Sequence, residues 1–188
     1  MPNRFRLLAA CVSLTAGAAT AAPIYTASGE LAFPADYREW VYMSSGLDMS
    51  YREGGREGGT GTDHSMFDNV FVDPAAWASF KQSGHWPDKT MFVLETRVAA
   101  SHGSINKHGQ FQTGQTMGVE VHVRDEARFK GGWGFFAFDG TAPAGQIPYE
   151  AECYACHKAN GAVDTTFTQF YPIAKPIAVK AGTFRETP

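Results

Sequence analysis

The sequence lacks a strong excess of charge of either sign. Its 188 residues include 16 basic and 19 acidic side chains, which gives a formal net charge of −3, and the sequence pI is about 6.0. Electrostatics therefore gives no reason to expect a nucleic acid or an anionic membrane as a partner. With 44% apolar and 13% aromatic residues, the composition fits one soluble globular domain and excludes a disordered, collagen-like or coiled-coil chain.

Long hydrophobic runs are also scarce, and the single clear one covers residues 7–19. Basic residues precede it, and Ala19-Thr20-Ala21 follows it as a small-x-small site for signal peptidase. The run is shorter than the roughly 20 residues that span a bilayer. The alternative is an amphipathic first helix of the mature fold. We expect a signal peptide at residues 1–21, export to a bacterial periplasm, and a single domain over residues 22–188.

Cysteine is rare, and two cysteines remain once Cys11 is removed with the signal peptide. Both lie in the segment Cys-Tyr-Ala-Cys-His at residues 153–157. In c-type haem attachment, two thiols spaced in this way bond to the haem vinyl groups, and the adjacent imidazole binds the iron. The alternatives are a structural disulfide, for which the spacing is tight, a thioredoxin-like redox pair, and a zinc site, which lacks an obvious fourth ligand. We predict one covalent haem c held by Cys153 and Cys156, with His157 as the iron ligand.

No methionine or histidine follows His157. A small electron-transfer cytochrome usually has its haem motif near the N-terminus and a methionine ligand downstream, and this sequence has neither feature. The upstream methionines and histidines are packing or loop residues by default. They are Met43, Met49, Met66, Met91, Met117, His64, His85, His102, His108 and His122. We predict five-coordinate iron with an open position, and the alternative is a sixth ligand from this set.

Four long amphipathic helices are absent, which excludes a four-helix cytochrome bundle, whereas strand patterns are common. Asp73-Pro74 and Gly84 are typical of a helix start and stop, and they bracket a helix through about Gln82. Strands are predicted at residues 41–43, 70–72, 91–99, 116–124 and 133–138, a helical turn at 34–40, and loops at 50–63 and 101–114. The predicted class is α+β, a mainly antiparallel sheet with a few short helices around one c-type haem.

Several segments in a fixed order carry a family resemblance. They are residues 33–41, 70–74, 86–88, 94–95, 151–158 and 167–172, and together they span nearly the whole mature chain. Their residues and order resemble those of the cytochrome P460 family, which includes the β-sheet cytochromes c′-β. The resemblance implies an antiparallel β fold, commonly a homodimer, with one c-type haem, His157 as its proximal ligand and an open distal face.

Leu94 departs from the pattern of the P460 enzymes. These enzymes oxidise hydroxylamine and carry a lysine bonded to the haem macrocycle, and our matching puts Leu94 at the position of that lysine. Leucine cannot form the bond, and Lys89 would need a register shift of five residues, which turns it to the opposite strand face. Cytochromes c′-β lack the cross-link and bind nitric oxide in an apolar pocket, so the resemblance implies a similar ligand here.

One strand face is predicted to form the wall of this pocket, because Phe92, Leu94 and Thr96 share it. We expect Phe92 and Leu94 to contact the haem, and Phe67 and Phe135 are further candidates. Core packing is the alternative for each phenylalanine. An apolar wall admits a small neutral ligand and offers no hydrogen bond to a bound anion.

Glu120 is the candidate catalytic residue. It matches an acidic position of the P460 pattern, where a carboxylate relays protons, although strand alternation favours a solvated face shared with His122 and Arg124. The leading hypothesis is an exported cytochrome that binds nitric oxide or a related small nitrogen ligand, with a possible redox partner protein. The alternative is an oxidoreductase acting on hydroxylamine, and an open ferric haem near an acid would also allow peroxidase-like activity.

Overall fold

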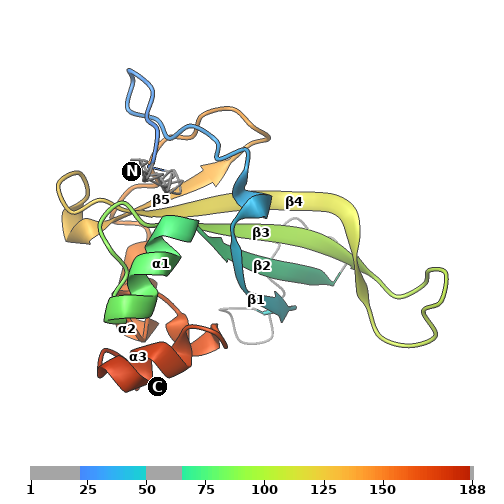
Figure 1. The fold of residues 1–188 in the computed structure, drawn as a ribbon. Helices are drawn as coiled ribbons and strands as arrows, with labels where there is room; N and C mark the ends of the chain where they lie inside the picture. The colour runs from blue at the N-terminus through green and yellow to red at the C-terminus, as the bar shows by residue number, and fades with distance from the viewer. Residues whose placement is uncertain (1–21, 50–64, 187–188) are drawn as a thin grey trace, which may run out of the picture.

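The structure is a computed structural model that describes residues 22–49 and 65–186. Its centre is a five-stranded antiparallel sheet in which each strand pairs with the next one along the chain (Figure 1). The strands are β1 (Val41–Leu47), β2 (Met66–Val72), β3 (Met91–Ala100), β4 (Phe111–Arg124) and β5 (Trp133–Phe138). The helices are α1 (Pro74–Ser83), α2 (Glu152–Asn160) and α3 (Lys175–Ala181), and short 3-10 turns are η1 (Tyr37–Glu39), η2 (Lys130–Gly132) and η3 (Thr168–Phe170). The predicted α+β class with an antiparallel sheet is confirmed.

The strand boundaries agree best with the predictions in the most apolar strands. β5 has the predicted bounds, and β3 ends one residue later than predicted. β4 begins at Phe111, so the last residues of the predicted loop 101–114 belong to the strand. These mostly polar residues pair with β3, and a polar strand segment shows no alternation of apolar and polar residues that would identify it. β1 and β2 likewise extend beyond the predicted fragments. The predicted loop 50–63 and signal peptide 1–21 lie outside the described residues.

The helix α1 has the predicted start and stop. The Asp73 carboxylate accepts a hydrogen bond from the Ala76 N–H at 2.8 Å, Pro74 occupies the first helical position, and Gly84 ends the helix with φ 72°. The second Asp73 oxygen accepts from the Met91 N–H at 2.9 Å, so one carboxylate joins α1 to β3. In residues 22–49 and 65–186, no helix has both the length and the apolarity needed to cross a membrane.

The sheet has a hydrophobic core on each face. The N-terminal segment covers one face, which we call the back face, and the three helices lie on the other, which we call the helix face (Figure 1). In β4, Val121 and Val123 point to the back-face core and are fully buried. On the helix face, Phe80 of α1 stacks on Trp86 with ring centroids 3.9 Å apart, and both side chains are buried.

A buried carboxylate, Glu95, anchors the N-terminal segment to the sheet. Its side chain is 2% exposed and accepts hydrogen bonds from the Tyr37 hydroxyl at 2.6 Å, Arg38 at 2.5 Å and Arg97 at 2.8 Å. Burial opposes the charge, but the bonds from Arg97, Tyr37 and Arg38 outweigh it and lower the pKa of Glu95 to about 2. The carboxylate is therefore charged at neutral pH.

Candidate functional site

Helix α2 carries the cysteine–histidine motif on one side. Cys153, Cys156 and His157 are spaced at i, i+3 and i+4, and residues with this spacing lie next to one another on a helix surface. Both cysteines are free thiols and partly buried. The helix ends at Gly161, whose N–H donates to the His157 carbonyl at 2.8 Å. Two thiols and an imidazole are thus presented together toward the helix face of the sheet.

The His157 ring is oriented by one hydrogen bond and by aromatic packing. Its Nδ1 lies 3.0 Å from the Thr165 carbonyl oxygen. A carbonyl can only accept, so Nδ1 carries the proton and Nε2 keeps a lone pair for a metal. The rings of Phe167 and Phe135 lie 4.2 and 5.0 Å from the His157 ring by their centroids. Burial lowers the pKa of His157 to about 4, so the imidazole is neutral at physiological pH.

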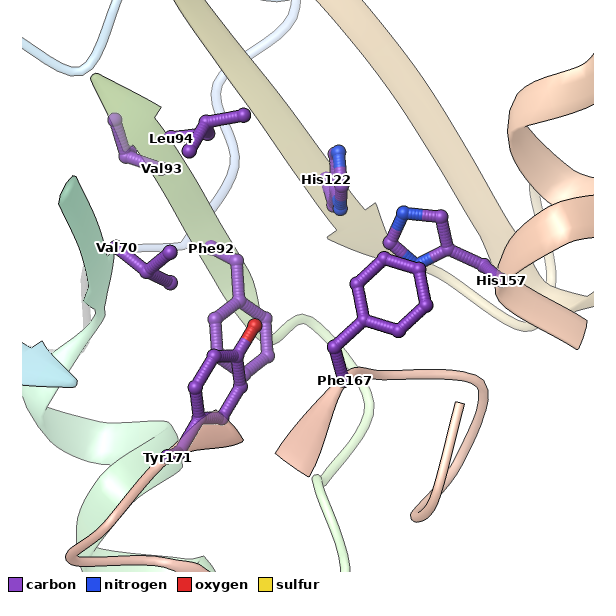
Figure 2. A pocket seen from close by; sticks show the side chains of 8 residues that line it. All are labelled: Val70, Phe92, Val93, Leu94, His122, His157, Phe167 and Tyr171. Carbon is purple, nitrogen blue, oxygen red and sulfur yellow. The ribbon is translucent and has the colours of Figure 1, made fainter. Parts of the chain in front are cut away.

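A pocket opens in front of His157 between the sheet and the C-terminal segment (Figure 2). Its cavity volume is about 50 Å³, and a neighbouring pocket of about 60 Å³ shares Val70, Leu94, Phe167 and Tyr171 with it. The side chains that line the first pocket are mainly apolar: Val70, Phe92, Val93, Leu94, His122, His157, Phe167 and Tyr171.

Strand register brings the predicted wall residues onto this pocket. Phe92 pairs with His122, and Leu94 pairs with both Val70 and Glu120. Phe92 is 4% exposed and packs edge-on against Trp86, whereas Leu94 is partly exposed. Phe92 and Leu94 therefore line the same pocket as His157. The structure brings the two wall residues and the three motif residues to one side of the sheet.

The other predicted wall candidates are placed differently. Phe135 packs against the rings of His157 and His122, two residues that line the pocket. Thr96 shares the strand face of Leu94, and its hydroxyl lies 3.2 Å from an Asp68 carboxylate oxygen. Phe67 pairs with Arg97 and lies on the opposite face of β2 from Asp68 and Val70.

On the face of β4 that strand alternation marks as solvated, Glu120 is exposed, as alternation predicts, whereas His122 is part of the site. His122 packs against the His157 ring with centroids 4.6 Å apart, and burial, followed by the charge of His157, holds the pKa of His122 well below its usual value. Alternation identified the face correctly, but α2 covers it at His122 through His157, and no feature of β4 alone predicts that contact.

His122 is too close to His157 to bind the same iron from the opposite side. Each metal–imidazole bond is about 2 Å long, so two axial imidazoles hold their ring centroids roughly 6 Å apart. The observed separation is 4.6 Å. In this arrangement His122 lies beside His157.

Glu120 stands beside the pocket with a second acid nearby. Its side chain is exposed, yet the surrounding protein desolvates the carboxylate enough to raise its pKa, and the Asp68 carboxylate raises it further. Glu120 in turn contributes to a raised pKa of the Cys153 thiol, after burial. Asp68 lines the second pocket. Sequence reasoning missed Asp68. The signal that could have found it is its position as the single acidic residue of the mainly apolar strand β2.

Other residues considered as iron ligands are spread over the fold. Met43 is buried in the helix-face core and Met91 in the back-face core, and His85 pairs with Asp164 at 3.1 Å. Within the described residues, Met49 is the methionine that lines one of the two pockets, and Met117 is exposed. His64 lies outside the described residues. Lys89, the other lysine considered for a cross-link, pairs with Asp125 at 2.5 Å.

These residues fit a c-type haem. Two partly buried thiols stand beside a neutral imidazole whose Nε2 is available, and the adjoining pocket is lined mainly by apolar side chains. Cys153 and Cys156 would attach the group, His157 would bind its iron, and Phe92 and Leu94 would contact its ring. Thr165 is a further functional residue that sequence reasoning missed, because it contributes a backbone oxygen that no side-chain pattern marks.

Comparison with known protein families identifies a family for this chain. A family model described as Cytochrome P460 matches residues 34–168, well over half of the chain. No curated protein matches the sequence. The matched range includes the sheet, the complete cysteine–histidine motif on α2 and Thr165, whose carbonyl is hydrogen-bonded to His157.

Proposed function

Because this chain belongs to the cytochrome P460 family of haem proteins, we propose that it is an exported c-type cytochrome with one covalent haem. Its iron keeps an open position that binds nitric oxide or a related small nitrogen ligand. The carrying observation is the grouping of Cys153, Cys156 and His157 on one side of α2, with Nδ1 of His157 already bonded to a carbonyl. The bound group supplies an iron centre for ligand binding and electron transfer.

The pocket chemistry supports a small neutral ligand. Val70, Phe92, Leu94 and Phe167 present carbon to the space in front of His157. These four side chains offer no hydrogen bond that would favour a charged ligand, and the polar groups of the lining besides His157 belong to His122 and Tyr171. Leu94 also replaces the cross-linking lysine of the P460 enzymes, and Lys89 is held by Asp125. These features favour ligand binding over hydroxylamine oxidation.

The central experiment is a visible spectrum of the ferrous protein produced with c-haem maturation. We expect a high-spin spectrum that shifts when nitric oxide is added. A low-spin spectrum without added ligand would contradict the open position. Met49→Leu then provides the matched test, because Met49 lines the second pocket, and conversion of a low-spin protein to high-spin by this change would identify Met49 as the sixth ligand.

Covalent attachment has its own test. We expect haem to stay with the wild-type chain after denaturation and to be lost from the Cys153→Ala, Cys156→Ala double variant, since the haem–thiol bonds are then absent. Intact mass measured under denaturing conditions distinguishes the two and counts the haems per chain. Haem that remains with the denatured double variant would refute attachment at this motif.

Hydroxylamine oxidation is a second candidate function, and Glu120 is the observation that favours it. The carboxylate lies on the sheet face of Leu94, and burial and then Asp68 raise its pKa, the direction that favours the protonated form needed for proton donation. The test is hydroxylamine turnover with an added electron acceptor, in wild type and in Glu120→Gln. Turnover that falls more than a hundredfold in Glu120→Gln would make oxidation the leading function.

Export and assembly complete the proposal. A mature chain that begins at Ala22 in the periplasmic fraction would support the signal peptide at residues 1–21, and an uncleaved chain would contradict it. We also propose a homodimer and a redox partner protein. Sedimentation of the haem-loaded protein tests the dimer, and a monomer at micromolar concentration would refute it.

A further inference from the structure

The turn that hydrogen-bonds His157 has an unfavourable backbone conformation. Its central residues, Asp164 and Thr165, have φ angles of 46° and 61°, and the Thr166 N–H closes it by donating to the Val163 carbonyl at 2.8 Å. Two consecutive positive φ angles are typical of a type I′ turn, which favours asparagine and glycine. A β-branched residue such as Thr165 is disfavoured there. Contacts elsewhere must therefore hold the turn.

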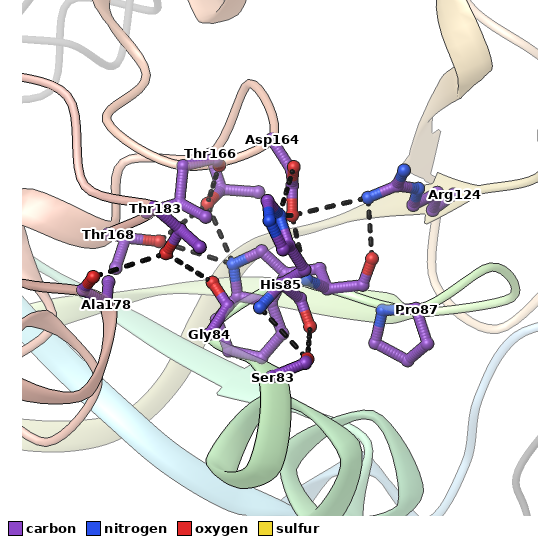
Figure 3. A network of polar contacts seen from close by, with 12 residues as sticks. Ser83, Gly84, His85, Pro87, Arg124, Asp164, Thr166, Thr168, Ala178 and Thr183 are labelled. Carbon is purple, nitrogen blue, oxygen red and sulfur yellow. Dashed lines mark hydrogen bonds and ion pairs between the residues drawn. The ribbon is translucent and has the colours of Figure 1, made fainter. Parts of the chain in front are cut away.

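The Asp164 carboxylate makes those contacts (Figure 3). It accepts a hydrogen bond from the Trp86 N–H at 2.8 Å, and its other oxygen lies 3.1 Å from His85 Nδ1. Arg124 lies 3.4 Å away and also donates to the Trp86 carbonyl at 2.5 Å. We call Asp164, His85, Trp86 and Arg124 the Asp164 clamp. The clamp ties the turn to the segment after α1 and to the end of β4.

The other side of the turn is fixed as well. The Trp86 indole N–H donates to the Thr166 hydroxyl at 3.0 Å. Gly161 lets the end of α2 approach closely, because a Cβ at this position would lie 2.6 Å from the Thr165 carbonyl carbon. Asp164 and Thr166, the residues on either side of Thr165, are thus both hydrogen-bonded to Trp86, and the Thr165 carbonyl oxygen is 3.0 Å from His157 Nδ1.

We propose that Asp164 is a positioning residue for the iron ligand. By clamping the strained turn to Trp86 and Arg124, it holds the Thr165 carbonyl on Nδ1 of His157 and so fixes the tautomer, the orientation and the donor strength of the imidazole. A hydrogen bond of this kind makes a ligating imidazole more basic, and such partners commonly change metal affinity or activity by 10–100-fold. The inference rests on the proposed function, because it concerns the ligand that His157 supplies.

The test compares Asp164→Ala with Asp164→Asn in the haem-loaded protein. Alanine cannot accept from the Trp86 N–H and disfavours positive φ, so the carbonyl shifts and His157 becomes a weaker donor. We expect the iron–histidine stretching band in the ferrous resonance Raman spectrum to move to lower frequency and the reduction potential to rise. Asparagine tolerates positive φ and keeps an acceptor oxygen, so Asp164→Asn should keep both values near wild type.

The control is Asp139→Asn, which removes an exposed acid that follows β5 and should leave band and potential unchanged. An unmoved band in folded, haem-loaded Asp164→Ala would overturn the proposal, as would an equal shift in Asp164→Asn. If Asp164→Ala does not accumulate, Arg124→Gln weakens the same clamp and should move the band in the same direction by a smaller amount. An unmoved band there would also overturn it.

Failure of the proposed function would look different. A wild-type chain that takes up no haem would refute the cytochrome assignment, and hydrogen exchange of the Trp86 amide in that chain would still report the clamp. We expect the amide to be protected in wild type and Asp164→Asn and to exchange faster in Asp164→Ala. Equal exchange in all three would show that Asp164 does not hold the turn.

Discussion

Acidification should destabilise the fold through Glu95, and the size of the effect follows from its contacts. The pKa of Glu95 falls from 4.5 to about 2 on folding, and a shift of that size corresponds to roughly 3 kcal/mol at about 1.4 kcal/mol per unit. The Arg38 side chain is 55% exposed, so solvent screening weakens its share of the interaction. We expect a net contribution of about 2 kcal/mol from the charge of Glu95.

The sign of the effect sets the pH range of the assay. The folded-state pKa is the lower one, so the stabilisation is complete above about pH 4.5 and is lost as the pH falls toward 2. Urea unfolding of wild type and Glu95→Gln should differ by about 2 kcal/mol at pH 7 with unchanged slope. The difference should shrink toward zero as the pH approaches 2, where about half of the folded wild-type molecules carry a protonated Glu95.

The matched control is Glu39→Gln, an exposed acid in the neighbouring turn η1, which should change stability by less than about 0.5 kcal/mol. A wild-type minus Glu95→Gln difference that stays constant from pH 7 to pH 2.5 would refute the reasoning. The loss would then come from packing or hydrogen bonding and not from the charge.

Three further changes probe the site and its support. Leu94→Lys places an amine directly opposite Glu120, and because a cross-strand ion pair contributes about 0.2–1 kcal/mol, the protein should stay folded. If the same change is made together with Cys153→Ala and Cys156→Ala, haem retained after denaturation would show a new covalent bond. Glu120→Gln should change nitric oxide affinity by less than the tenfold that about 1.4 kcal/mol represents, and a larger change in a binding titration would contradict an apolar binding mode. Phe80→Ala removes a fully buried ring stacked on Trp86 and should cost about 3–5 kcal/mol in urea unfolding, with a cost under 1 kcal/mol arguing against that packing.

Sequence patterns predicted the fold well where a segment is stabilised by interactions between residues that are neighbours in sequence. Asp73, Pro74 and Gly84 set the ends of α1 through hydrogen bonding and backbone geometry that depend on neighbours in sequence. The apolar residues of β5 gave its bounds. The start of β4 was missed because residues 111–115 owe their strand conformation to pairing with β3, and their own polarity is typical of a loop.

The site divides in a similar way. The grouping of Cys153, Cys156 and His157 on one side of α2 could be predicted because the proposed attachment chemistry needs fixed spacing. The placement of Phe92 and Leu94 at the pocket followed from strand parity and the family resemblance. The environment of His122 was not predictable from β4, since its covering by α2 is a contact between segments far apart in sequence. The roles of Asp164 and Thr165 depend on a backbone conformation that only the folded chain displays.

The order of the strands also bears on how the protein assembles. Each strand pairs with its neighbour in sequence, so the sheet forms through short-range closures that fold quickly. The cysteine–histidine motif comes after all five strands, and a chain that grows from its N-terminus completes the wall of the pocket before the motif emerges. The sheet can thus act as a template for the late segment. In the proposed cytochrome, attachment of haem to the extended motif would then compete with the docking of α2 onto a sheet that has already formed.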